Sequence, residues 1–169
     1  NAGGNSVLYS AFSQNDDGFT QFPGYGGLEN DLGRKVLISS GGEILIAGYS
    51  TINGQRQFYV LNFAKPATVV LTPTPQWRYN SETLGESEAN DIVEVSDGFV
   101  IVGFNEVEND RQMFITKIDK SGTSTPIWEQ EYGFESFDEA NAVIATDDNG
   151  IAVLGTSSDE RGNRIMTLL

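Results

Sequence analysis

The residues that could carry chemistry in this chain are mostly carboxylates. The sequence has 24 acidic residues against 10 basic ones, for a formal net charge of −14, and it contains neither histidine nor cysteine. Glycoside hydrolysis needs two carboxyl groups roughly 5–10 Å apart. With so many acids, some pair will meet that distance by accident. The carboxylates alone therefore identify no reaction, and we expect a protein without catalytic residues.

The missing residue types exclude several other kinds of site. Without histidine, the chain lacks the usual general base near neutral pH and the commonest metal ligand. Without cysteine, it has no disulfide, no thiol nucleophile and no cysteine-ligated metal. Asp16-Asp17-Gly18 and the acidic stretch at 147–150 do not match the alternating ligand spacing of a calcium loop, and both are expected at hairpin turns. The sequence therefore predicts no cofactor and no metal site.

The acidic balance also bears on partners and on membranes. A nucleic-acid-binding surface needs basic residues to neutralise phosphates, so no nucleic-acid partner is expected. No stretch approaches the roughly 20 apolar residues that span a bilayer, so no transmembrane segment is predicted. Lipid anchoring stays open. The chain starts at Asn1 rather than Met, which suggests a processed or excerpted polypeptide.

The acidic side chains are positioned by a pattern that recurs along the chain. In its clearest copy, at 90–133, a short apolar run is followed by the turn Asp97-Gly98 and by a wholly apolar run that ends at Gly103. Two further strand-like segments complete the unit. Equivalent glycines stand at Gly48 and Gly155, at intervals of about fifty residues. From each of the three glycines, the step to the first apolar residue of the next run is the same, so we take the repeat as real.

This pattern predicts an all-β fold of antiparallel four-stranded β-propeller blades. The second run of each repeat is apolar throughout, as in a strand covered on both faces, and the fourth alternates like an exposed edge strand. Gly41-Gly42, Asp97-Gly98 and Asn149-Gly150 are expected to supply the positive φ angles of tight hairpins. We expect a single domain over 1–169, with repeats at about 1–25 (partial), 26–80, 81–133 and 134–169 (partial). Closed propellers have about 4–8 blades, so this chain is expected to be part of a larger propeller or of one closed by oligomerisation.

The same residues resemble a known family. A tryptophan, then Tyr-Gly, an apolar strand, Asp-Gly or Asn-Gly, and an apolar strand ending in glycine is similar to the tryptophan/tyrosine-glycine β-propeller repeats, over roughly 7–169. Such repeats are common in exported and surface proteins of Bacteroidota-type bacteria. The resemblance implies an extracytoplasmic protein at the cell surface or outer membrane, of which a lipoprotein is one form. It implies little about function, because one fold hosts many roles.

In a four-stranded blade, the loops between strands two and three and those between blades open on the same face. Many of the acids fall in these loops, which predicts an acidic loop face. The candidate binding residues on this face are Asp31, Glu88, Glu106, Glu108, Asp110, Arg111, Asp138 and Glu139. A purely solvated rim, without a ligand, is the alternative interpretation of the same residues.

Two other sets of residues recur from repeat to repeat. Arg56, Arg111 and Arg164 occupy nearly the same place and are expected to pair with neighbouring acids, although a site for carboxylates or sugars is the alternative. Trp77 and Trp128 are expected to pack between blades, with a sugar-stacking platform as the alternative.

These observations favour a non-enzymatic, extracytoplasmic binding or scaffold module. Its acidic loop face would steer a basic protein partner into loops held by rigid strands, as in an accessory surface lipoprotein of an outer-membrane complex. A carbohydrate-binding or glycoside-hydrolysing propeller is the alternative, with a glycan as ligand. A glycan site should contain an exposed aromatic side chain beside polar groups in a concave pocket.

Overall fold

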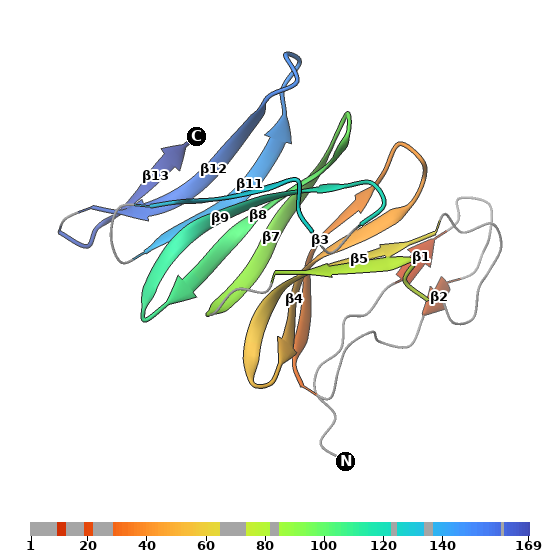
Figure 1. The fold of residues 1–169 in the computed structure, drawn as a ribbon, viewed down its shortest axis with the longest axis horizontal. Coiled ribbons are helices and arrows are strands. Elements are labelled where there is room, and N and C mark those ends of the chain that lie inside the picture. The colour runs from red at the N-terminus through yellow and green to blue at the C-terminus, as the bar shows by residue number, and fades with distance from the viewer. Residues whose placement is uncertain are drawn as a thin grey trace.

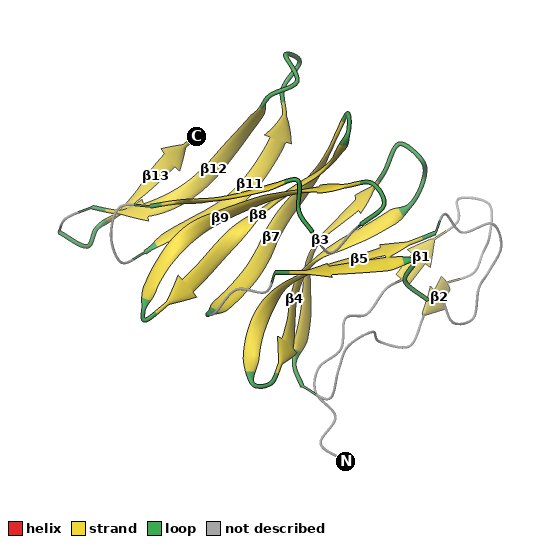
Figure 2. Ribbon diagram, viewed as in Figure 1, coloured by secondary structure: helices red, strands yellow, loops and turns green. Residues whose placement is uncertain are grey.

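A computed structural model describes residues 10–12, 19–21, 29–64, 74–81, 85–122, 125–133, 137–159 and 161–169. Within this part of the chain every regular element is a β-strand and there is no helix (Figure 2). The predicted all-β, antiparallel fold is confirmed. Most of the partial repeat expected over 1–25 lies outside the described residues, which there include only the paired strands β1 (Ser10–Phe12) and β2 (Phe19–Gln21).

Three larger antiparallel sheets follow one another along the chain, and each is ordered in space as it is in sequence (Figure 1). The first sheet contains β3 (Asp31–Ile38), β4 (Ile44–Ile52), β5 (Gln55–Phe63) and β6 (Trp77–Asn80). The second contains β7 (Glu86–Val95), β8 (Gly98–Val107), β9 (Asp110–Asp119) and β10 (Trp128–Tyr132). The third contains β11 (Asp138–Ala145), β12 (Ile151–Ser158) and β13 (Arg164–Leu168).

The second sheet packs between the first and the third, and two apolar clusters fill the interfaces. Between the first and second sheets lie Leu45, Ala47, Phe58, Val60, Tyr79, Ala89, Ile92, Phe99, Ile101, Phe114 and Ile118. Between the second and third lie Val100, Val102, Met113, Ile115, Ala140, Val143 and Val153. Because β8 contributes to both clusters, it is apolar on both faces, as its sequence predicts. The described sheets do not close into a ring.

Each first strand contains a β-bulge at the same place. The pairing of the first strand with the second skips Arg34 in β3, Asn90 in β7 and Asn141 in β11. We call these three the bulge residues. A bulge adds one unpaired residue, bends the strand and changes the direction of nearby side chains. The repeat in sequence is therefore also a repeat in local backbone geometry.

The recurring glycines are explained by these bulges. Gly48, Gly103 and Gly155 each pair with the residue just before a bulge. A Cβ atom added to Gly103 would lie 1.8 Å from the backbone oxygen of Glu88, and one added to Gly48 would lie 1.8 Å from that of Leu32. The bent first strand thus leaves no room for a side chain, and glycine is required for close approach of two backbones.

The hairpin turns follow the predicted chemistry only in part. Gly42 and Asn149 have positive φ angles of 84° and 66°, as expected. Asp97 and Gly98 do not; Gly98 is instead the first residue of β8, where a Cβ atom would lie 2.1 Å from the backbone oxygen of Ile118. That expectation was wrong because close strand packing, rather than turn geometry, requires this glycine.

Substitution of Gly103 by alanine tests the role of the recurring glycines. We expect Gly103→Ala to lower the free energy of unfolding by about 2–4 kcal/mol, because the new methyl group forces the β7 and β8 backbones apart. Gly41→Ala is the control, since its Cβ atom would meet nothing closer than 3.6 Å. Urea unfolding measures both; equal stability of the two variants would contradict the close-approach explanation.

Candidate functional site

Three of the candidate binding residues lie in strands and are buried. Asp31 begins β3, Glu88 lies inside β7 and Asp138 begins β11, and their exposed fractions are only 4%, 1% and 0%. The prediction that they belong to an exposed loop face was wrong. Each first strand starts earlier than its apolar run, because it continues past the bulge to pair with the polar end of the second strand.

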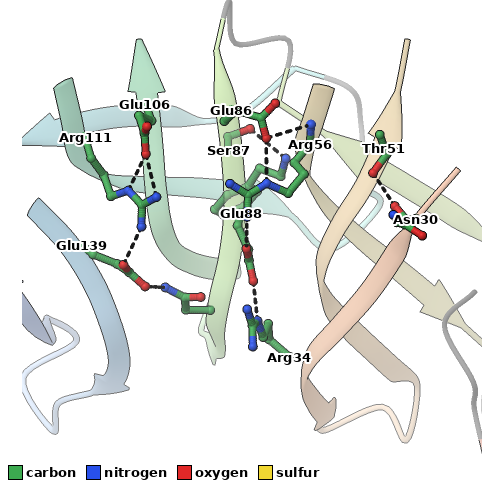
Figure 3. Close-up of polar contacts among 12 residues, drawn as sticks. Asn30, Arg34, Thr51, Arg56, Glu86, Ser87, Glu88, Glu106, Arg111 and Glu139 are labelled. Carbon is green, nitrogen blue, oxygen red and sulfur yellow. Dashed lines mark hydrogen bonds and ion pairs between the residues drawn. The ribbon is translucent and has the colours of Figure 1, made fainter. Parts of the chain in front are cut away.

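The other five candidates lie at the same end of the sheets, which we call the rim. Glu106 lies near the end of β8, Asp110 and Arg111 begin β9, and Glu139 lies in β11. The prediction of loop positions was therefore wrong for these four residues as well. Glu108 occupies the two-residue turn between β8 and β9, and Asp110 follows it; both side chains are exposed. Arg34 and Arg56 of the first sheet lie at the same end, so the rim contains residues from all three sheets (Figure 3). Most of these side chains contact one another.

The buried carboxylate of Glu88 joins the first sheet to the second. It accepts a hydrogen bond from Nε of the bulge residue Arg34, and its other oxygen lies 3.3 Å from Nη1 of Arg56 in β5 (Figure 3). Arg56 also donates to Glu86 at 2.6 Å. Burial opposes the charge of the Arg56 guanidinium, but the Glu86 hydrogen bond and the attraction of both glutamates outweigh it and raise the arginine pKa.

Glu139 joins the second sheet to the third in the same way. It accepts hydrogen bonds from the bulge residue Asn90 at 2.9 Å and from Nη1 of Arg111 in β9 at 3.0 Å. Arg111 also pairs with Glu106 at 2.6 Å and lies over the ring of Phe104, 3.8 Å from its centroid. Both interfaces therefore use one glutamate of the next sheet, held by a bulge residue and by an arginine of the third strand.

Sequence comparison of the repeats found part of this arrangement. Arg56 and Arg111 pair with acids, as predicted. The bulge residues were missed because they differ in type, arginine in one sheet and asparagine in the next, and a register skip leaves no compositional signal. Asp91 was also missed: its carboxylate accepts the backbone N–H of Val143 at 3.0 Å and pairs with Lys35 at 3.0 Å, so it too links neighbouring sheets.

A concave pocket lies at the opposite end of the sheets, away from the rim. Its volume is about 630 Å³, and its lining includes Glu94, Asp97, Lys117, Lys120, Trp128 and Thr146. Lys120 pairs with Glu94 and Lys117 with Asp97, both at 2.7 Å. Burial alone would raise the pKa of Glu94, but hydrogen bonds from Lys120 and Ser40 hold it below its ordinary value. The hydrogen bond from Lys117 likewise lowers the pKa of Asp97.

Both tryptophans take part in packing, as predicted. Trp77 lies against the cluster between the first and second sheets, 6.2 Å from the Phe99 ring between centroids. Trp128 lies against the cluster between the second and third sheets and also lines the pocket. Trp128 therefore keeps the second interpretation open as well, because an aromatic side chain beside paired charges is a common feature of sugar sites.

Among the residues that the structure describes, no three acidic side chains gather so as to hold a metal ion. A comparison with known protein families found no match, and a comparison with curated proteins found no relative. In the described part of the chain, no helix is long and apolar enough to cross a membrane.

The buried glutamate of the first interface provides a direct stability test. Glu88→Gln keeps the shape but removes the charged partner of Arg34 and one of the two charged partners of Arg56, so we expect a loss of about 1–3 kcal/mol in unfolding free energy. Glu108→Gln removes the same charge from an exposed turn and should change stability by less than about 0.5 kcal/mol. Denaturant titration of both variants makes the comparison; similar losses would mean that Glu88 contributes only through overall charge.

Proposed function

We propose that this chain forms part of a β-propeller of the tryptophan/tyrosine-glycine kind, with each four-stranded sheet as a blade. Support comes from the antiparallel order of the strands, the face-to-face packing of successive sheets and the bulge that recurs in each first strand. On this proposal the protein works outside the cytoplasm, and a surface lipoprotein accessory to an outer-membrane complex is the form that the resemblance implies.

We further propose that the module binds a basic protein partner at the rim and catalyses no reaction. The observation that carries this is the turn between β8 and β9. Glu108 and Asn109 both have left-handed backbones, with φ angles of 53° and 68°, so the two strands join in a tight, twisted hairpin. Glu108 and Asp110 are thereby presented at the end of the second sheet, which packs between the other two.

The other rim acids are already engaged within the molecule. Glu88 is buried, and Glu86, Glu106 and Glu139 each pair with an arginine. Carboxylates nevertheless outnumber guanidinium groups at this end, so their summed field is negative and extends beyond the surface by about one Debye length, roughly 8–10 Å. Glu108 and Asp110 would make the direct contacts, and the remaining acids would steer the partner. A polypeptide rich in lysine and arginine fits this surface.

The left-handed conformation of Glu108 supports a role beyond folding. A side chain with a Cβ atom costs about 1–2 kcal/mol in this region, and asparagine or glycine would be better tolerated. The β4–β5 turn has Asn53 and Gly54 at the equivalent positions. A glutamate at this position of the β8–β9 turn therefore lowers the stability of the fold, which favours a contact that needs its charge.

The test uses the protein with an affinity tag, expressed in its own host, and identifies the proteins that it retains at low salt. Against the purified partner, we expect Glu108→Gln/Asp110→Asn to slow association about fivefold, with the difference lost near 0.5 M salt. The matched control, Asp147→Asn/Asp148→Asn, removes the same charge from exposed positions in the β11–β12 turn, at the opposite end of the sheets, and should leave association unchanged. Association that is independent of salt, or slowed equally by the control, would contradict rim binding.

Glycan binding in the pocket is a second candidate, and the position of Trp128 favours it. The pocket is concave, and it combines this aromatic side chain with two lysine–carboxylate pairs and Thr146, which can donate and accept hydrogen bonds to sugar hydroxyls. These features support a carbohydrate site, with Trp128 half-buried at its wall rather than fully exposed.

An oligosaccharide array, with neutral and charged glycans, tests the second candidate. We expect Trp128→Phe to weaken a bound glycan about tenfold, since a smaller ring gives less stacking area but keeps the apolar packing. Trp77→Phe is the matched control, because that tryptophan lies between sheets away from the pocket lining. Absence of glycan binding, or equal effects of the two substitutions, would remove this candidate.

A further inference from the structure

The third sheet has an outer face, turned away from the second sheet, on which apolar side chains are exposed. Ile144 is 62% exposed, Leu154 39%, Met166 81% and Leu168 74%. Pairing places them on one face, because Leu154 lies opposite Leu168 and side chains two residues apart share a face. Contiguous exposed apolar area of this kind marks an interaction surface.

The outer face repeats the two faces that are buried elsewhere in the protein. Met166 and Leu168 pair with β12 as Met113 and Ile115 pair with β8. In the second sheet these equivalents are only 1% and 3% exposed, because the third sheet covers them. The first sheet has Phe58 and Val60 at the same positions, buried against the second sheet. The same surface therefore receives a neighbouring sheet in both cases that the structure shows.

The polar groups of the interface are repeated as well. Arg164 takes the position of Arg56 and Arg111, since it pairs with Ser158 as they pair with Thr51 and Glu106. Asn141 takes the position of the bulge residues Arg34 and Asn90. In the first two sheets, this pair of positions holds a glutamate of the next sheet.

In the third sheet the pair holds no such acid. Arg164 is exposed and lies over the Phe137 ring, 4.0 Å from its centroid, and no carboxylate of the described residues pairs with it. Asn141 accepts a hydrogen bond from Thr156 at 3.0 Å, which leaves its amide nitrogen free to donate. The outer face of the third sheet is therefore apolar, with two hydrogen-bond donors, Arg164 and Asn141, at one corner.

We propose that this outer face docks a further antiparallel β-sheet, supplied by a partner polypeptide segment, whose first strand has a glutamate at the position of Glu88 and Glu139. The glutamate binds Arg164 and Asn141, and the partner's apolar residues cover Met166, Leu168 and Leu154. The inference rests on the propeller-like packing of successive sheets proposed above, and it is argued from register and charge complementarity, independently of the acidic rim.

A second copy of this chain fits the requirement less well. The first sheet has Leu32, not a glutamate, at the position of Glu88 and Glu139. Its Ile44 and Ile46, equivalent to the residues of β8 and β12 that meet a preceding sheet, are already buried, each 8% exposed. The first sheet of another copy would therefore bring neither the acid nor a free apolar face.

The test extends the full chain with its own sequence. A copy of residues 117–169 is joined directly after Leu169, which is equivalent in register to Thr116, so that β13 continues as β9 does. The extension adds a fourth strand to the third sheet and then a sheet that has a copy of Glu139. The readout is oxidation of Met166 by hydrogen peroxide, followed by mass spectrometry; trypsin gives different peptides for Met166 and for its copy.

We expect Met166 to oxidise fast in the 169-residue chain and about tenfold more slowly in the extended one, because peroxide reaches a covered thioether only through local opening. Met113, 1% exposed, should be protected in both and reports that the fold is intact. In the extended chain, Arg164→Gln should restore part of the Met166 rate, about two- to fivefold. Arg161→Gln is the matched control, at an exposed arginine of the β12–β13 turn, and should have no effect.

Three results would overturn the proposal. Equal oxidation of Met166 in both chains, with Met113 protected, would show that the face does not accept such a sheet. Equal effects of Arg164→Gln and Arg161→Gln would show that the acid is not recognised. Protection of Met166 in the 169-residue chain that rises with concentration, together with a dimer mass by light scattering, would show that a second copy is the occupant.

Discussion

The arrangement of the described sheets depends on a carboxylate that the second and the third sheet each place against the preceding sheet. Glu88 and Glu139 project from the first strands of the second and third sheets, and each is held by a bulge residue and by an arginine of the preceding sheet. A buried carboxylate is costly unless it is paired and hydrogen-bonded. If two sheets slid past one another, this charge would lose its hydrogen-bond donors. Apolar packing alone has no preferred direction, so the paired carboxylate fixes how neighbouring sheets are aligned.

This constraint changes how the acidity of the chain is understood. A net charge of −14 looks at first like a property of the surface alone. Some of the acids instead link neighbouring sheets inside the protein. Asp91 accepts a hydrogen bond from a backbone N–H of the third sheet, and Glu88 is almost fully buried. Other acids, such as Glu108 and Asp110 at the β8–β9 hairpin, are exposed.

The strands could be predicted from the sequence because the same pattern of apolar runs and glycines recurs in each repeat. Gly48, Gly103 and Gly155 gave the register of the units, and the structure explains them through backbone contact at the bulges. The burial of Asp31, Glu88 and Asp138 could not be predicted, because a polar residue beside an apolar run is usually a loop residue. Here the first strand continues beyond its apolar part. Tertiary pairing with the polar end of the second strand, rather than local preference, sets that boundary.

The most direct measurement of the central constraint is a double-mutant cycle on Arg111 and Glu139, read out as unfolding free energy. Both side chains are about one-fifth exposed, so their interaction is only partly screened. With Arg111→Met, Glu139→Gln and the double variant, we expect a coupling energy of about 1 kcal/mol or more, since each partner orients the other across the interface. A coupling energy within about 0.3 kcal/mol of zero would mean that the sheets are aligned by apolar packing alone.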